Sequence, residues 1–274
     1  MQQIIEHVFV ETKYLDCNAG VVLTQQGPVV IDTPMFPNDV RDLRDQIRRL
    51  TKQRIAYLIY THEHFDHVLG AKGLTNRVIA HYKAAVDIEY LKKNLTEEIT
   101  FFNPDLYKQH KDIFDNIDII PPQITFVNEM KLYTGSPELE LSWLGGHSPA
   151  SIMIYIPQDK VLFCGDNVDV SMPFIAPYSR FGEWINALKR IEGMAVERIM
   201  PGHDDVCSMK DIHRTRVLFE TTRDWIQKLI KTGANKEQVL GKIDLSEALL
   251  LPDSPIIKQQ VQTMVGMMWD EMRK

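Results

Sequence analysis

The amino-acid sequence predicts an α+β fold: a main domain of strands and helices followed by added C-terminal helices. Three observations favour this class. Segments of strand length lie near the start and again between residues 124 and 164. The stretch over residues 82–120 is mostly helical in pattern. After about residue 209 apolar residues recur at helical spacing, so we expect a first domain over residues 1–209 and a helical extension over residues 210–274 packed on it.

The first elements are expected to be a β-meander and one helix. Residues 8–11, 20–24 and 28–32 have the composition of short strands, with a turn at residues 25–27. From Asn38 the apolar residues share one helical face, and arginines interleaved with aspartates occupy the other. The aspartates favour a solvated surface over a phosphate-binding patch.

The most informative segment is Thr-His-Glu-His-Phe-Asp-His at residues 61–67, directly after an apolar run at residues 55–60. Residues two apart in an extended chain point the same way, so His62 and His64 can converge on one ion. Asp66 and His67 follow where the chain turns, and they can address a second point. These ligand types suit Zn, Mn or Fe. A polar loop without metal is the alternative, and four such side chains within six residues argue against it.

Residues 82–120 are rich in aromatic side chains and lie between two parts of this candidate site. They can form a lid or a wall of a ligand pocket, or simply pack as helices on the sheet. Both interpretations stay open. Strands are expected again at residues 124–127, 130–133, 139–144, 151–157 and 161–164.

Each later candidate ligand follows a strand-like segment and a glycine. His147, Asp166 and His203 come directly after Gly146, Gly165 and Gly202. Glycine lets the backbone bend closely around an ion. Each of these ligands alone is a weak signal, but together with the first cluster they complete two coordination shells. We expect His62, His64 and His147 to hold one metal, Asp66, His67 and His203 to hold the other, and Asp166 to bridge the two.

The loop at residues 167–180 leaves the edge of the candidate site and is expected to contact the substrate. Tyr178 can donate a hydrogen bond, and Arg180 can meet a carboxylate. Met172 and Phe174 can form an apolar wall. The alternative is that these side chains only cover neighbouring helices.

Two helical stripes follow in the C-terminal part. One comprises Val217, Thr221, Trp225 and Leu229, and the other Ile257, Val261, Met264, Met268 and Met272. The methionine stripe is expected to be core, either capping the domain or pairing with its copy in a homodimer.

Composition restricts the class of partner. A net charge of −6 gives no basic face for nucleic acid, so we expect a small-molecule substrate and no nucleic-acid partner. Neither a signal peptide nor an apolar run long enough for a bilayer is visible, so no membrane partner is expected. Three scattered cysteines, Cys17, Cys164 and Cys207, fit a reducing compartment, and we expect a cytoplasmic protein.

The motif set His62-x-His64-x-Asp66-His67, Gly146-His147-Ser148, Gly165-Asp166 and Pro201-Gly202-His203 resembles the metallo-β-lactamase superfamily in its glyoxalase II-like dinuclear form, over about residues 4–208. The resemblance implies a four-layer αβ/βα sandwich with the ligands on loops at one edge. It also implies a catalytic domain over residues 1–209 and a supporting role for Asp32 behind the ligands.

At several positions this chain differs from related families, and these differences limit the activities that the resemblance implies. Zinc β-lactamases of the commonest class carry a cysteine where this chain has Asp166, which argues against β-lactam hydrolysis as the main activity. Flavodiiron oxidoreductases carry a glutamate where this chain has His64. The region after residue 210 shows no match to the glutathione-binding part of glyoxalase II, and no RNA-binding arm is found.

The ligand set indicates hydrolysis. Two cations that share a water lower its pKa from about 16 towards about 7, which gives a hydroxide able to attack a carbonyl carbon. Asp66 is the expected catalytic residue, since it can orient the nucleophile or carry a proton. We expect two divalent ions, Zn first with Mn or Fe as alternatives, and an ester, thioester, lactone or related acyl substrate. The competing hypothesis is a sulfur dioxygenase with a single non-haem iron.

Overall fold

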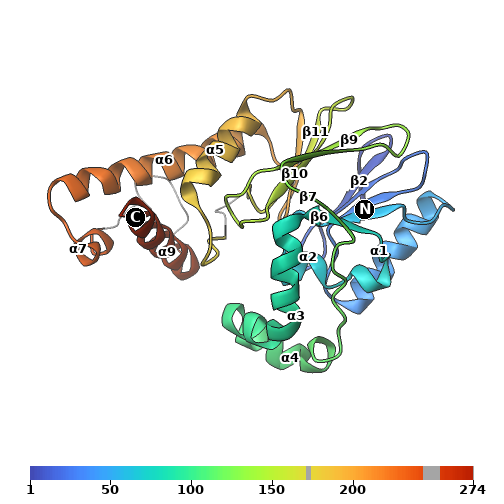
Figure 1. Cartoon of the computed structure of the whole chain (residues 1–274), viewed down its shortest axis with the longest axis horizontal. Coiled ribbons are helices and arrows are strands. Elements are labelled where there is room, and N and C mark those ends of the chain that lie inside the picture. Colours follow the sequence, from blue (N-terminus) through green and yellow to red (C-terminus); the bar gives the residue numbers. More distant parts are fainter. Residues whose placement is uncertain (171–173, 243–253, 274) are drawn as a thin grey trace.

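The computed structural model describes residues 1–170, 174–242 and 254–273. Two β-sheets face each other, with helices on both outer sides (Figure 1). The first sheet has the strand order β1-β2-β3-β4-β5-β6-β7, antiparallel up to β4 and parallel from there on. Its strands are β1 (Gln2–Ile5), β2 (Val8–Glu11), β3 (Ala19–Val22), β4 (Val29–Ile31), β5 (Tyr57–Ile59), β6 (Val78–His81) and β7 (Ile124–Phe126).

The second sheet has the order β12-β11-β10-β9-β8, in which β11 and β12 pair in parallel and the other neighbours are antiparallel. It contains β8 (Glu129–Leu132), β9 (Leu139–Trp143), β10 (Ile152–Ile156), β11 (Val161–Gly165) and β12 (Arg198–Pro201). The strands expected between residues 124 and 164 are therefore confirmed within one residue at each end.

The helices are α1 (Pro37–Leu50), α2 (Phe65–Val68), the 3-10 helix η1 (Ala71–Gly73), α3 (Tyr82–Phe102), α4 (Pro104–Phe114), α5 (Phe181–Glu192), α6 (Met209–Lys231), α7 (Lys236–Leu240) and α9 (Pro255–Met272). The helical interpretation of residues 82–120 is confirmed by α3 and α4. Strands β1 and β6 were not predicted. The first is an exposed edge that begins with two glutamines, and the second is a run of only four residues.

Alternating side chains build a core on both faces of each sheet. On β4, Val30 packs towards α1 and α3, whereas its neighbour Ile31 packs between the sheets. On β11, Leu162 packs against Trp184 of α5, whereas Phe163 packs between the sheets. The result is helices, sheet, sheet and helices in four layers, which confirms the α+β class and the sandwich that the resemblance implied.

Of the two predicted C-terminal stripes, one matches the buried face and one is offset. Val261, Met264 and Met268 of α9 are buried within the chain. On α6 the predicted stripe is rotated from the true core face, because Thr221 is exposed while Leu218 and Thr222 are buried. Among the described residues, no helix combines the length and apolar content that a membrane span requires.

Helix α9 reaches back to the segment that precedes α5. The Glu271 carboxylate accepts hydrogen bonds from the backbone N–H groups of Phe181 and Gly182, both at 2.9 Å. The Gln260 side chain accepts one from the backbone N–H of Ile175 at 2.8 Å. The first N–H groups of a helix have no partner inside the helix, so Glu271 satisfies two of them for α5. Helix α9 therefore holds the backbone at both ends of the segment of residues 175–182.

We expect Trp184→Ala to lower the free energy of unfolding by about 3–5 kcal/mol, because it leaves a cavity among apolar neighbours. Trp184 is 0% exposed, and its ring lies 4.9 Å from that of Phe219 on α6. Urea unfolding followed by circular dichroism measures the change. The matched control is Phe101→Ala at a 70% exposed position, where a change within about 0.5 kcal/mol is expected. Equal losses in both variants would contradict this packing.

Candidate metal centre

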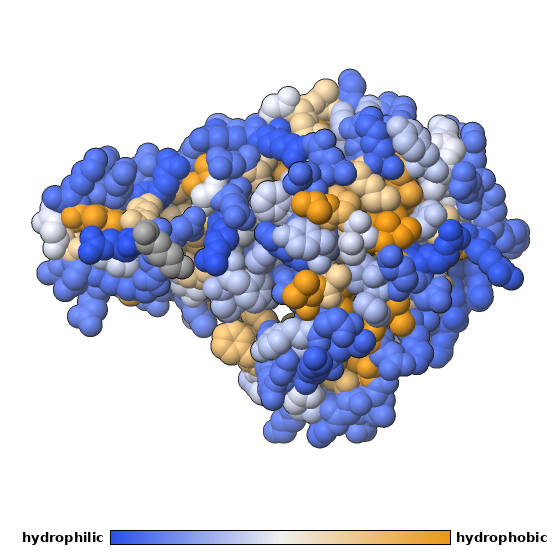
Figure 2. All heavy atoms as spheres, viewed as in Figure 1, coloured by the Kyte–Doolittle hydropathy of each residue, from blue (hydrophilic) through white to orange (hydrophobic). Residues whose placement is uncertain are grey.

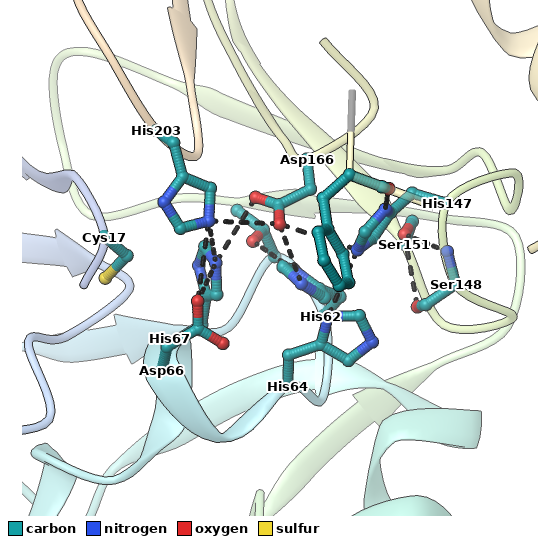
Figure 3. A network of polar contacts seen from close by, with 12 residues as sticks. Cys17, His62, His64, Asp66, His67, His147, Ser148, Ser151, Asp166 and His203 are labelled. Carbon is teal, nitrogen blue, oxygen red and sulfur yellow. Dashed lines mark hydrogen bonds and ion pairs between the residues drawn. The ribbon is translucent and has the colours of Figure 1, made fainter. Parts of the chain in front are cut away.

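The seven predicted ligands meet at one edge of the sandwich. His62, His64, Asp66 and His67 follow β5, and His147, Asp166 and His203 follow β9, β11 and β12. The parallel pairing of β11 and β12 brings the ends of these two strands to the same edge. Figure 3 shows these side chains pointing toward one another from separate loops.

Two adjoining groups of potential ligand atoms result. In the first, atoms of His62, His64, His147 and Asp166 all lie within 4.8 Å of one another, and in the second the same holds for Asp66, His67 and His203. Within the first group, His147 Nε2 lies 3.1 Å from His64 Nδ1. Within the second, His67 Nε2 lies 3.4 Å from His203 Nε2. Lone pairs held this close repel unless a proton or a cation lies between them.

The Asp166 carboxylate lies between the two groups. Its Oδ2 is 3.5 Å from His147 Nε2 in the first group and 3.2 Å from His203 Nε2 in the second. Its Oδ1 is 3.3 Å from His67 Nε2. This position is the one that the predicted bridging role requires.

Two buried atoms at this point indicate that the cluster is built for cations. Among the described residues, His62 Nε2 and Asp166 Oδ1 are buried without a hydrogen-bond partner. An unsatisfied buried polar atom is costly, whereas a metal ion would satisfy both. The donor set of imidazoles and carboxylates is also one that divalent ions accept. The residues present therefore fit divalent metal ions.

The pKa values of the histidines separate the two groups. Burial lowers the pKa of His64 and of His147 to about 3, so both rings are neutral and able to act as ligands. For His203 burial has the same effect, but the carboxylates of Asp166 and Asp66 outweigh it and raise the pKa to about 9. The second group thus retains a proton that a divalent cation can replace.

Asp32 supports the cluster from behind, as the resemblance implied. It has a left-handed backbone with a φ of 56°. Its Oδ1 accepts from the backbone N–H of Thr61 at 2.7 Å, and its Oδ2 accepts from the Thr61 hydroxyl at 2.6 Å. The same Oδ2 lies 2.9 Å from His67 Nδ1, which leaves Nε2 of that ring facing the cluster.

The loop before α5 supports the first group. The Tyr178 hydroxyl lies 2.7 Å from His64 Nε2, and the Phe174 carbonyl oxygen lies 3.1 Å from His147 Nδ1. Tyr178 therefore contacts a candidate ligand, in addition to lining a cavity beside it. Arg180 is exposed at the start of α5, and Met172 lies outside the described residues.

The cysteines take no part in this arrangement. Cys17, Cys164 and Cys207 are free and buried. Burial raises the pKa of the Cys164 thiol well above its usual value, and it raises that of Cys207 to about 12. Neither thiol is suited to act as a nucleophile. The Ser148 hydroxyl donates to Glu63 Oε2 at 2.7 Å, which indicates a structural role.

The cluster opens into a cavity of about 290 Å³. Phe102 of α3 and Phe174 form its apolar walls, so residues 82–120 supply one wall of the pocket as well as core packing. The sequence indicated Phe102 only as one of several aromatic residues in the 82–120 segment, and it did not single out Thr61 or Asn167, whose Oδ1 accepts from the backbone N–H of His147 at 3.1 Å. For Thr61 a signal was present, since it directly precedes the first histidine. The lining of the cavity is given by His64, Phe65, Asp66, Phe102, Asp166, Phe174 and His203.

Known proteins with similar sequences include hydrolases of two kinds. The chain is 24% identical to a type 2 metallo-beta-lactamase of Bacillus cereus over 223 residues, which cover 75% of this chain and 77% of the relative. It is 26% identical to the human acyl-coenzyme A thioesterase MBLAC2 over 206 residues, which cover 68% of this chain and 72% of that protein.

Solved structures share the fold at low sequence identity. The inverting sec-alkylsulfatase Pisa1 from Pseudomonas sp. matches with a TM-score of 0.78 and 15% identity over 98% of this chain, which spans about half (49%) of the alkylsulfatase. A metallo-beta-lactamase family protein of Thermus thermophilus matches with a TM-score of 0.68 and 15% identity, covering 99% of this chain and 95% of that one.

The family model described as the metallo-beta-lactamase superfamily matches residues 13–203, which is more than half of the chain and includes all seven ligand positions. The geometry of the cluster and the relatives agree with that match. The protein belongs to the metallo-beta-lactamase superfamily and is a metal-dependent hydrolase.

Proposed function

We propose that the protein cleaves an ester, thioester, lactone or related acyl bond of a small molecule with the help of two divalent metal ions. The observation that carries this proposal is the pair of adjoining ligand groups on either side of Asp166. Relatives that are named as β-lactamases and as acyl-coenzyme A thioesterases support it, because both reactions displace a leaving group from a carbonyl carbon.

The residues would divide as the sequence predicts. His62, His64 and His147 would hold one ion, Asp66, His67 and His203 the other, and Asp166 both. We propose zinc for both ions, with Mn or Fe as alternatives, because these ligands are borderline or hard. When bound, such ions polarise a substrate carbonyl and lower the pKa of water.

Asp66 is the catalytic residue of the proposal. Its carboxylate lines the cavity, and its Oδ2 lies 3.5 Å from His203 Nε2 and 3.6 Å from His67 Nε2. One oxygen can therefore act as a ligand while the carboxylate also orients the attacking water or accepts its proton. Phe102 and Phe174 line the same cavity and offer apolar contacts to a substrate.

A sulfur dioxygenase with one iron is not favoured. That activity needs a single complete ligand set, whereas the second group in this chain is also complete and lies beside the first. The relatives named above are a β-lactamase and a thioesterase, which are both hydrolases.

Metal analysis tests the ligand assignment. We expect two divalent ions per chain after reconstitution with zinc, and about one in His203→Ala, because the second group then retains two ligands. Mass spectrometry of metals after gel filtration measures both numbers. His213→Ala is the control, since that exposed ring pairs with Glu192 outside the site. A single iron per wild-type chain together with oxygen uptake would instead support the dioxygenase.

Asp66→Asn is expected to lower kcat by about 10²–10⁴-fold, because the amide cannot accept a proton. Hydrolysis is measured on a panel of lactones, thioesters, phosphodiesters and β-lactams. The matched control, Asp105→Asn, removes an exposed carboxylate from α4 and should leave kcat unchanged. Full activity of Asp66→Asn on every substrate cleaved by the wild type would exclude the proposed role.

Tyr178→Phe separates support of a ligand from contact with substrate. Since its hydroxyl contacts His64 Nε2, we expect a loss of about tenfold or more in metal affinity at the first group. Competition with a chelator measures the affinity, and Tyr133→Phe at an exposed position is the control. An unchanged metal affinity with a raised KM would assign Tyr178 to the substrate.

A further inference from the structure

A second cavity, of about 360 Å³, adjoins the metal cavity. The two share His64, Phe65 and Phe102 in their walls, so the second cavity lies directly beside the metal cavity. Its full lining comprises Glu63, His64, Phe65, Asp87, Tyr90, Leu91, Glu98, Phe102, Pro149 and Tyr178. The outer wall comes from α3, and Figure 2 shows apolar side chains beside that helix as well as on other parts of the same face.

Three carboxyl groups from two elements face this cavity. Asp87 and Glu98 lie on α3, and Glu63 lies between two candidate metal ligands. Glu63 is buried, and it accepts a hydrogen bond from the Ser148 hydroxyl. Within the described residues none of the three forms a salt bridge. The nearby cation that acts on Asp87 is Lys83, whose ammonium instead lies 4.8 Å from the centre of the Trp143 ring.

This concentration of negative charge is costly for the protein alone. Burial raises the pKa of Asp87 in spite of the nearby Lys83, and burial together with the negative charge of Glu97 raises the pKa of Glu98. A cation in the cavity would stabilise the charged forms of both carboxyl groups.

Aromatic rings complete the recognition chemistry. Tyr90, Phe102 and Tyr178 line the same cavity, and ring faces attract ammonium groups, especially where water is excluded. Leu91 and Pro149 add apolar contacts. Carboxylates combined with aromatic rings are the surroundings that bind a substituted ammonium, whereas they repel a phosphate or carboxylate.

We propose that this cavity binds a positively charged ammonium group of the substrate while the scissile acyl bond lies at the metal cluster. The inference rests on the proposed function and specifies its substrate class as a cationic ester, thioester or lactone. A polyanionic leaving group would be repelled from this cavity by the carboxyl groups that line it. The specificity-determining residues are Asp87 and Glu98.

Binding to the metal-loaded protein tests this without any turnover. Choline and its uncharged carbon isostere, 3,3-dimethylbutan-1-ol, have the same shape, and isothermal titration calorimetry measures the Kd of each. We expect choline to bind about tenfold more tightly or better. Glu98→Gln and Asp87→Asn should each reduce this ratio several-fold. Glu97→Gln makes the same charge change at the adjacent, exposed position of α3 and should preserve the ratio.

Hydrolysis of the acetyl esters of the same two alcohols tests the inference kinetically. We expect kcat/KM for the choline ester to exceed that for the uncharged ester by a similar ratio. Equal Kd values for the two alcohols would overturn the inference, and so would a ratio that survives both α3 variants. If Glu98→Gln loses bound metal while the ratio of the two Kd values stays unchanged, the carboxylates compensate the charge of the metal ions instead, and the inference is wrong. Selective choline binding without hydrolysis of any acyl substrate would refute the proposed function while leaving the ammonium site intact.

Discussion

The structure depends on holding seven ionisable side chains together, largely out of water, at one edge of two packed sheets. Such a group is unfavourable by itself, since burial opposes charge and neighbouring lone pairs repel. The protein responds in two ways within a few ångströms. His64 and His147 of the first group stay neutral because burial lowers their pKa values, and His203 of the second group retains a proton because the carboxylates of Asp166 and Asp66 raise its pKa. A neutral imidazole can bind a divalent cation directly, and in the second group a bound cation can replace the retained proton.

This constraint accounts for parts of the chain that contribute no ligand. Asp32 and Thr61 fix the orientation of His67 from below, and the segment of residues 174–180 fixes His64 and His147 from the side. That segment is in turn tied to α9 through Gln260 and Glu271. Helix α9 therefore supports the candidate ligands indirectly, through the loop that contacts them.

Features that depend on local sequence patterns could be predicted, whereas features that depend on tertiary contacts could not. The candidate ligands could be recognised because H-x-H-x-D-H follows a strand and because glycines precede His147, Asp166 and His203, which are local patterns. Strand β6 and the buried face of α6 could not, since one is too short for periodicity and the other is set by tertiary packing. Tyr178 was expected at the substrate, and only the folded loop places its hydroxyl beside His64. The acidic cavity was invisible for the same reason, because Glu63, Asp87 and Glu98 lie on separate turns and converge only in three dimensions.

The charges around the site bear on what can enter it. Two divalent ions would carry four positive charges against the carboxylates of Asp66 and Asp166, so the metal cavity would attract an electron-rich carbonyl oxygen. The next cavity has a different character, since it is lined by the carboxyl groups of Asp87 and Glu98 and by the buried carboxyl group of Glu63, none of which forms a salt bridge among the described residues. A neutral substrate would gain nothing from these carboxyl groups, and an anionic one would be repelled from the second cavity. A molecule with a polar acyl bond at one end and a cation at the other would be attracted by the metal ions at its first end and by the carboxyl groups at its second. These two contacts together would orient its scissile bond toward Asp66.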